Sequence, residues 1–288
     1  MMFLQDTYDY FSLPLMLLGI YSLMAMGLQL ILGGAGLLSL GHAIFFCIGG
    51  YTSAIISSTY LPLITDSNLL QLILSALCAF LVSGFFAFFM IIPCLRLKEN
   101  YFAMATLALG EVLSTVIKNL DFTGGIRGFK DIPSLDINPL IVGLIVLIVY
   151  LVLRRFYKSS MGYIIRSTRD DDIALQSLGI SHFKSQIIAF TLGSAIAGMG
   201  GGFYAHTIQF MSPEEGSFNR SIEILLAVVI GGMNSLTGSL IGSLVIVAIP
   251  EILRFGPSEI AQNRNVFFAS AVILLMLFRP KGLIKHGS

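Results

Sequence analysis

Long apolar runs constrain the fold of this chain more than any other feature of its sequence. Residues 69–94, for example, carry no charged side chain, and an α-helix needs about 20 apolar residues to cross the bilayer core. Charged residues make up only 11% of the chain, against about 25% in soluble proteins. Lipid must cover the remaining apolar surface, so we predict an all-α polytopic membrane protein with one transmembrane domain over residues 1–288.

The apolar runs predict about nine transmembrane helices, with eight or ten as alternatives. The candidate spans are 11–32, 37–57, 69–94, 101–118, 138–156, 185–208, 221–234, 238–255 and 265–279. The seventh is short for a full crossing.

Lysine and arginine in the loops predict the orientation, because cytoplasmic loops carry an excess of both. If residues 154–184 are cytoplasmic, alternation of the spans puts eleven basic residues inside and six outside. The N-terminus is then outside, the C-terminus is cytoplasmic, and the N-terminal acids Asp6 and Asp9 lie outside.

One polar, charged insert interrupts the apolar pattern at residues 160–183. Ser167 and Thr168 are each followed by an acid three positions later, a spacing similar to a capping box. Gly179 stands where a left-handed residue could end a helix. The insert therefore predicts a short surface helix, a glycine stop and a second helix entering the membrane, and we favour a docking role over a plain solvated loop.

Two glycine-rich stretches lie at membrane depth, at 33–51 and 231–242. Gly-interrupted spans in two halves of a chain can mark a transport pathway, whereas small residues can equally serve close helix packing. Both readings stay open for these stretches. For Gly198 and Gly202, at GxxxG spacing, we favour helix packing.

Polar residues inside apolar spans are candidates for a translocation path, because charge in the bilayer core is costly. The candidates are Ser39, His42, Glu111, Glu223 and Asn234. Glu111 could instead lock two helices, and a lone histidine such as His42 is more often a packed, hydrogen-bonded residue.

The remaining polar residues do not predict a role in transport. His206 and Gln209 lie near the outer end of their span and could be hydrated, and Glu251 and Arg254 have the i,i+3 spacing of an ion pair. Neither the cysteines nor the histidines have metal-ligand spacing, and no phosphate-loop motif occurs. A net charge of +1 argues against nucleic-acid binding.

Several motifs in order resemble one family. The run Ile173-Ala174-Leu175-x-x-x-Gly179 has the spacing of the EAA-x-x-x-G coupling motif of ABC importer permeases. The chain resembles the LivM/LivH-type branched-chain amino-acid permease family over about residues 22–284, and LivM more than LivH. The matching segments are GLQLILGGAGLLSLGHAIFFCIGGYTSA (27–54), LRLKENYFAMATLALGEV (95–112), TGGIRGF (123–129), MGYIIRSTRDDDIALQSLGI (161–180), FTLGSAIAGMGGGFYA (190–205), SPEEGSFNRSIEILLAVVIGGMNSLTGSLIGS (212–243) and LFRPKGL (277–283).

The resemblance implies a permease subunit of an ATP-driven importer in a bacterial inner membrane. It implies two ABC ATPase subunits that hold ATP and magnesium, a second, LivH-like permease, and an external substrate-binding protein. The chain itself would hold no cofactor. The implied ATPase-coupling residues are Arg166, Arg169, Asp170, Asp171, Asp172, Ala174, Leu178 and Gly179, and the implied binding-protein loops contain Gly124, Gly125, Arg127, Glu214 and Glu215. Ile126 and Arg127 depart from the small or acidic residues that the family often has there.

The implied substrates are leucine, isoleucine and valine, with urea, amides or another small solute as the alternative within the family. A stand-alone ion-coupled secondary transporter is a different class, for which Glu111, His42 and Glu223 could supply an ion site. An intramembrane enzyme is disfavoured because no catalytic pair is recognisable.

Overall fold

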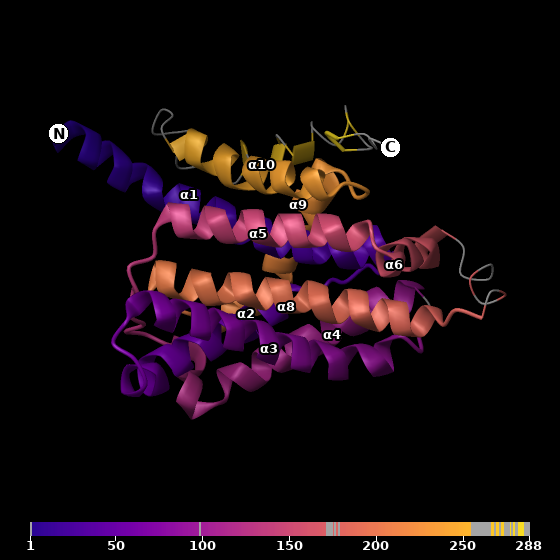
Figure 1. The fold of residues 1–288 in the computed structure, drawn as a ribbon, viewed down its shortest axis with the longest axis horizontal. Helices are drawn as coiled ribbons and strands as arrows, with labels where there is room; N and C mark the ends of the chain where they lie inside the picture. Colours follow the sequence, from indigo (N-terminus) through magenta and orange to yellow (C-terminus); the bar gives the residue numbers. More distant parts are fainter. Residues whose placement is uncertain are drawn as a thin grey trace.

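The structure, a computed structural model, is helical throughout the described residues apart from loops and one isolated β-bridge (Figure 1). It describes residues 2–97, 99–170, 175, 177, 179–254, 266–267, 269–270, 272–273, 277, 279 and 282–284, with the backbone alone at 2–10, 99–100 and 170.

The long helices follow the apolar runs. They are α1 (Met2–Gln29), α2 (Ala43–Ile55), α3 (Asn68–Cys94), α4 (Glu99–Lys118), α5 (Pro139–Tyr157), α8 (His182–Ile208), α9 (Phe218–Gly231) and α10 (Leu236–Arg254). Shorter elements are the π-helical turns η1 (Leu30–Gly34) and η2 (Ile56–Tyr60), the helix α6 (Ser160–Asp170), and the 3₁₀ turns η3 (Leu61–Leu63), η4 (Asp121–Thr123), η5 (Gly125–Arg127) and η6 (Pro213–Gly216).

Seven helices in the described part of the chain are long and apolar enough to cross a membrane. They correspond to the first six predicted spans and the eighth. The seventh, α9, has 14 residues, which cover only about 21 Å of a bilayer core about 30 Å thick. The ninth predicted span lies largely outside the described residues. The chain is therefore a polytopic membrane protein, and the total of nine spans stays a prediction.

The second predicted span, 37–57, starts later than expected. Helical backbone continues through η1 to Ala35, and the break at residues 36–42 follows before α2 starts at Ala43. Non-helical backbone at membrane depth is tolerated only where it is buried in protein or lines a water-filled cavity. Two side-chain hydroxyls accept from the backbone here, since Leu40 N donates to Thr106 Oγ1 (3.2 Å) and Ala43 N donates to Ser221 Oγ (3.0 Å).

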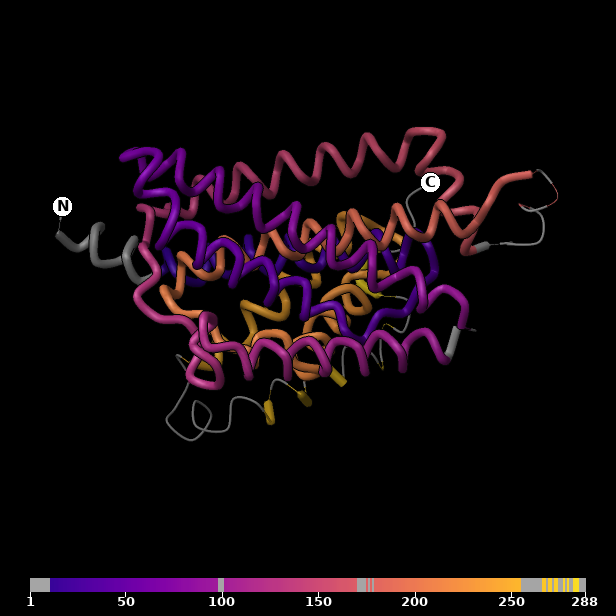
Figure 2. The backbone as a smooth tube through the Cα atoms, turned by 90° about the horizontal axis from the view of Figure 1, so that it is seen from below, coloured from indigo at the N-terminus to yellow at the C-terminus, as the bar shows by residue number. Residues whose placement is uncertain are grey.

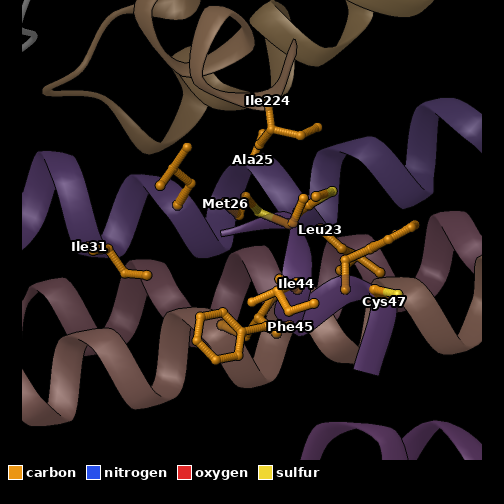
Figure 3. Packing of buried hydrophobic residues seen from close by; sticks show 14 of the residues in the cluster. Leu23, Ala25, Met26, Ile31, Ile44, Phe45, Cys47 and Ile224 are labelled. Carbon is orange, nitrogen blue, oxygen red and sulfur yellow. The ribbon is translucent and has the colours of Figure 1, made fainter. Parts of the chain in front are cut away.

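The core forms where α8 packs against α1, α2 and α3. Figure 3 shows apolar side chains from α1, η1, α2 and α9 meeting around Met26 and Ile44. Glycines let the backbones approach, as at Gly27 and Gly193, where a methyl group on either residue would overlap the other's carbonyl oxygen. Gly198 and Gly202 face Ala79 of α3, which confirms helix packing as their role.

The bundle has two distinct ends (Figures 1 and 2). One carries α6 and the start of α8, on the right of both views. The other carries the loop between α4 and α5, which pairs with the segment after α8 through the bridge between Phe129 and Met211. The two predicted binding-protein loops thus lie together, at the end opposite α6.

Candidate functional site

The predicted coupling segment contains a helix that starts earlier than expected. Helix α6 begins at Ser160, so Ser167 and Thr168 lie inside it. Their hydroxyls donate back to the carbonyls of Tyr163 (2.9 Å) and Ile165 (2.5 Å). The capping-box interpretation was wrong, because a hydroxyl in a continuing helix bonds to the preceding turn instead of capping a new one.

The glycine stop is confirmed. Gly179 has φ +75°, and Ile180 N donates to Leu175 O at 3.2 Å. This is the 6→1 bond of a Schellman motif, in which the left-handed residue closes a helix end. Of the other predicted coupling residues, Asp171, Asp172, Ala174 and Leu178 lie outside the described residues, and Asp170 is described by its backbone alone.

The two arginines of α6 turn toward the bundle. Arg166 donates to Tyr157 O (2.8 Å) and lies over the rings of Tyr157 and Tyr163, at 5.7 and 5.0 Å from their centroids. Arg169 donates to Gly33 O (2.8 Å) and to Asn234 Oδ1 (2.5 Å). Of the path candidates, Asn234 therefore contacts α6.

Three path candidates come together at the break before α2. The side chains of Ser39 and His42 are fully buried, and neither Ser39 Oγ nor the ring nitrogens of His42 form a hydrogen bond of ordinary geometry within the described residues, although the Met24 carbonyl lies near the ring. Gly41 packs on the backbone of Thr106 and of Gly110, the residue before Glu111. An unpaired buried polar group costs about 1–3 kcal/mol, so stability alone does not account for this pair.

The Glu111 carboxylate accepts a hydrogen bond from Phe218 N at 3.1 Å. Phe218 is the first residue of α9, and a carboxylate there interacts favourably with the positive end of the helix dipole. Both readings of Glu111 survive, since the same group ties two helices together and lies beside the break.

We expect Glu111→Gln to preserve assembly, because the amide oxygen can still accept from Phe218 N, and to slow transport if the charge faces the path. Glu111→Leu should loosen α9 in either case. Comparing solute uptake and the yield of folded protein for the two variants separates the readings. Loss of folded Glu111→Gln would favour the structural lock.

Glu223 belongs to a charged cluster that the sequence interpretation missed. Arg220 contacts Glu215 (2.5 Å) and Glu223 (2.8 Å) and also donates to the Tyr21 hydroxyl. Tyr204 completes the cluster by donating to Glu215 at 2.9 Å. Four elements, α1, α8, η6 and α9, meet here. The i,i+3 spacing of Arg220 and Glu223 was the available signal, but Glu215 and the tyrosines had none.

The binding-protein loops keep some of their predicted residues exposed and bury others. Gly124 and Gly125 have positive φ, and Arg127 and Glu214 are exposed. Glu215 turns inward to the Arg220 cluster. His206, expected to be hydrated, is 1% exposed and bonds Pro133 O (2.8 Å), Ser53 Oγ (3.0 Å) and Ser75 Oγ (3.3 Å).

The predicted pair of Glu251 and Arg254 is confirmed, with Arg254 Nη1 at 3.2 Å from Glu251 Oε1. The described residues contain no group of three or more potential metal ligands.

Comparison with known proteins identifies the family. Residues 11–277 match the family described as "Branched-chain amino acid transport system / permease component". The chain belongs to this family. As a permease component it is a transport protein and not an enzyme, as predicted.

Permeases of both types named in the sequence analysis are among the relatives. The "High-affinity branched-chain amino acid transport system permease protein LivM" of Salmonella typhimurium is 30% identical, over 92% of this chain and 68% of the relative. The "Probable branched-chain amino acid transport permease protein LivM" of Methanocaldococcus jannaschii is 24% identical, over 96% and 93%. The LivH permease of Salmonella typhimurium is 24% identical, over 92% and 91%. No solved structure matches the chain.

Proposed function

We propose that the chain is the transmembrane subunit of an ATP-driven importer for leucine, isoleucine or valine. Two ATPase subunits, which carry ATP and magnesium, would bind the α6 end of the bundle. A second, homologous permease would complete the pore, and an external binding protein would deliver the solute to the opposite end. Another small solute such as urea or an amide is the alternative substrate.

The observation that carries the proposal is the separation of two surfaces at opposite ends of one bundle. At one end, α6 is followed by a helix end closed at Gly179 with φ +75°. At the other, the loop with Gly124 and Gly125 pairs with the segment at Met211. An importer driven from one side and loaded from the other needs this separation, and the names of the relatives support the substrate.

The excess of basic residues on the α6 side supports a cytoplasmic position for α6 and an external N-terminus in a bacterial inner membrane. The break at residues 36–42 supports a path nearby, because discontinuous helices form the binding sites of many transporters. Closure of the ATPase dimer would move the 160–183 segment, and the helices beside His42 and Glu111 would then open to the other side.

The first experiment is affinity purification of the tagged chain from its native membrane, with mass spectrometry of the proteins that accompany it. We expect two ATPase subunits and a second permease. A chain that purifies alone and monodisperse, and whose transport follows a proton or sodium gradient, would contradict the proposal and favour an ion-coupled transporter.

Replacing Gly179 by valine tests the coupling segment. A methyl group at Gly179 would meet no atom of the described residues within 4 Å, so we attribute the effect to the left-handed backbone, which costs a β-branched residue about 1–2 kcal/mol. We expect normal membrane insertion and several-fold less bound ATPase.

The matched control is Gly179→Asn, because asparagine tolerates the left-handed region. It should retain the ATPase subunits. Full ATPase content and normal transport in Gly179→Val would count against the coupling role.

A further inference from the structure

We propose that Arg169 is a positioning residue that transmits movement of α6 to two breaks in the transmembrane helices. The first break is the non-helical segment 36–42 before α2, together with the end of η1 that leads into it (33–35), and the second is the turn 232–235 between α9 and α10. This inference rests on the proposed function and deepens it, since it assigns Arg169 to a contact inside the permease instead of to the ATPase surface.

The guanidinium of Arg169 contacts both breaks at once. Its Nη1 donates to the carbonyl of Gly33 at 2.8 Å and to the side-chain oxygen of Asn234 at 2.5 Å. The three residues come from positions 136 and 65 residues apart in the sequence. A charged donor shared by two acceptors makes a stronger tie than neutral hydrogen bonds do.

The stem of Arg169 also packs on the first break. Gly36 has φ +72°, and a methyl group added there would lie 2.7 Å from Arg169 Cγ and 3.2 Å from its Cβ. The backbone at Gly36 thus approaches the arginine stem as only glycine allows. Moving α6 therefore pushes or pulls on this segment through packing as well as through hydrogen bonds.

The two breaks contact each other directly. Gln29 Nε2 donates to the carbonyl of Met233, and a methyl group on Gly33 would overlap that same carbonyl oxygen. The segment 282–284 joins the junction, because Leu283 N donates to Ile230 O (2.8 Å) and Ile284 N to Gly231 O (3.2 Å). A displacement at Arg169 thus reaches the ends of α1 and α9 and the start of α10.

These elements lead to the candidate path. Helix α9 starts at Phe218, which the Glu111 carboxylate holds, and its Ser221 holds the first turn of α2 beside His42. The segment after α1 continues into Ser39 and His42. Through Arg169, movement of α6 can therefore displace both the segment that precedes α2 and helix α9, which contacts the start of α2.

The test measures solute transported per ATP hydrolysed by the purified complex in liposomes. We expect Arg169→Gln to keep the ATPase subunits bound and to lower this ratio at least about fivefold, the lower end of typical coupling between sites. Asn234→Ala should lower it in the same direction. The double variant should lower the ratio by less than the two single effects combined, because both residues form the same contact.

The control is Arg155→Gln, which removes an exposed cation at the end of α5. It should transport like the wild type. A ratio for Arg169→Gln equal to that of the control would overturn the proposal, and so would loss of ATPase subunits from Arg169→Gln, since that result would place Arg169 at the docking surface.

A second measurement needs no ATPase. Spin labels at Leu38 and Met233, both exposed, report the separation of the two breaks in a chain whose three cysteines are replaced by alanine. We expect Arg169→Gln to broaden the distance distribution and Arg155→Gln to leave it unchanged. An unchanged distribution in Arg169→Gln would overturn the proposal. If the wild-type chain purifies without ATPase subunits, the proposed function fails, and this measurement alone decides whether Arg169 holds the junction.

Discussion

Gly201→Ala is expected to prevent stable folding of the permease. Gly201 lies on α8 where α2 crosses it, and an added methyl group would overlap the carbonyl oxygen of Phe46, closer than real side chains ever come. Backbone atoms cannot rotate away as a flexible side chain can, so the helices must separate. Overpacking typically costs about 1–3 kcal/mol, and more where the neighbour cannot move.

Other close contacts between α2 and α8 prevent the helices from shifting to make room for the added methyl group. Gly49 of α2 approaches the backbone of Gly198 equally closely, and Gly50 packs on the Met211 side chain and on the carbonyl of Gly201. A shift of α2 that relieves one crowded position therefore separates the others. Since α8 also carries the packing of α1 and α3, we expect the loss to affect the whole bundle.

Gly143→Ala is the matched control. Gly143 lies within helix α5, and a methyl group there meets no atom within 4 Å in the part of the chain that the structure describes. Alanine favours helix over glycine by about 1 kcal/mol, so this variant should be as stable as the wild type or more so. The measurement is the melting temperature of the detergent-solubilised chain, followed by size-exclusion chromatography. Equal melting temperatures for the two variants would contradict the packing argument.

Hydropathy was sufficient to locate the spans because length and apolar content alone decide whether a helix can cross lipid. It placed the gap between the first two spans at residues 33–36 and missed that the backbone stays non-helical from residue 36 to residue 42. That segment is as apolar as a helix, and its backbone is held partly by Thr106 and Ser221, residues far away in the sequence. The sequence shows a glycine-rich run there, but does not show which distant hydroxyls will accept from its amides.

The coupling segment illustrates the same limit at short range. Gly179 was correctly predicted because a positive φ is a local property that glycine signals directly. The start of α6 was wrong by about two turns, because Ser167 and Thr168 fit a cap and a helix interior equally well. The inward direction of Arg169 depends on Gly33 and Asn234, which no local pattern connects to it.

The sequence did not predict the charged cluster around Arg220, for a different reason. Its members come from α1, α8, η6 and α9, and only Glu223 has a helical spacing from Arg220. Glu215 was assigned to a binding-protein loop from the family resemblance, which says nothing about the direction of its side chain. The fold instead directs its carboxylate to Arg220 and Tyr204.

Arg220→Met is expected to be the most damaging single charge removal in the described part of the chain. The side chains of Arg220 and Glu215 are only 21% and 15% exposed. Removing one partner of a buried ion pair leaves the other uncompensated, which costs about 3–5 kcal/mol. The Tyr21 and Glu223 contacts are lost at the same time, so α1 and α9 should both loosen at this end of the bundle.

The cost should come from the stranded carboxylate more than from the lost arginine. We therefore expect Arg220→Met combined with Glu215→Gln to recover part of the melting temperature that Arg220→Met loses. The pair of Arg254, whose side chain is 54% exposed, and Glu251 is the control, because pairs at the surface contribute about 0–1 kcal/mol and Arg254→Met should change the melting temperature little. If Arg220→Met is no worse than Arg254→Met, or if the double variant recovers nothing, the cluster does not hold α1, α8 and α9 together, and its charges would instead be available to the solute or to a partner at that end of the bundle.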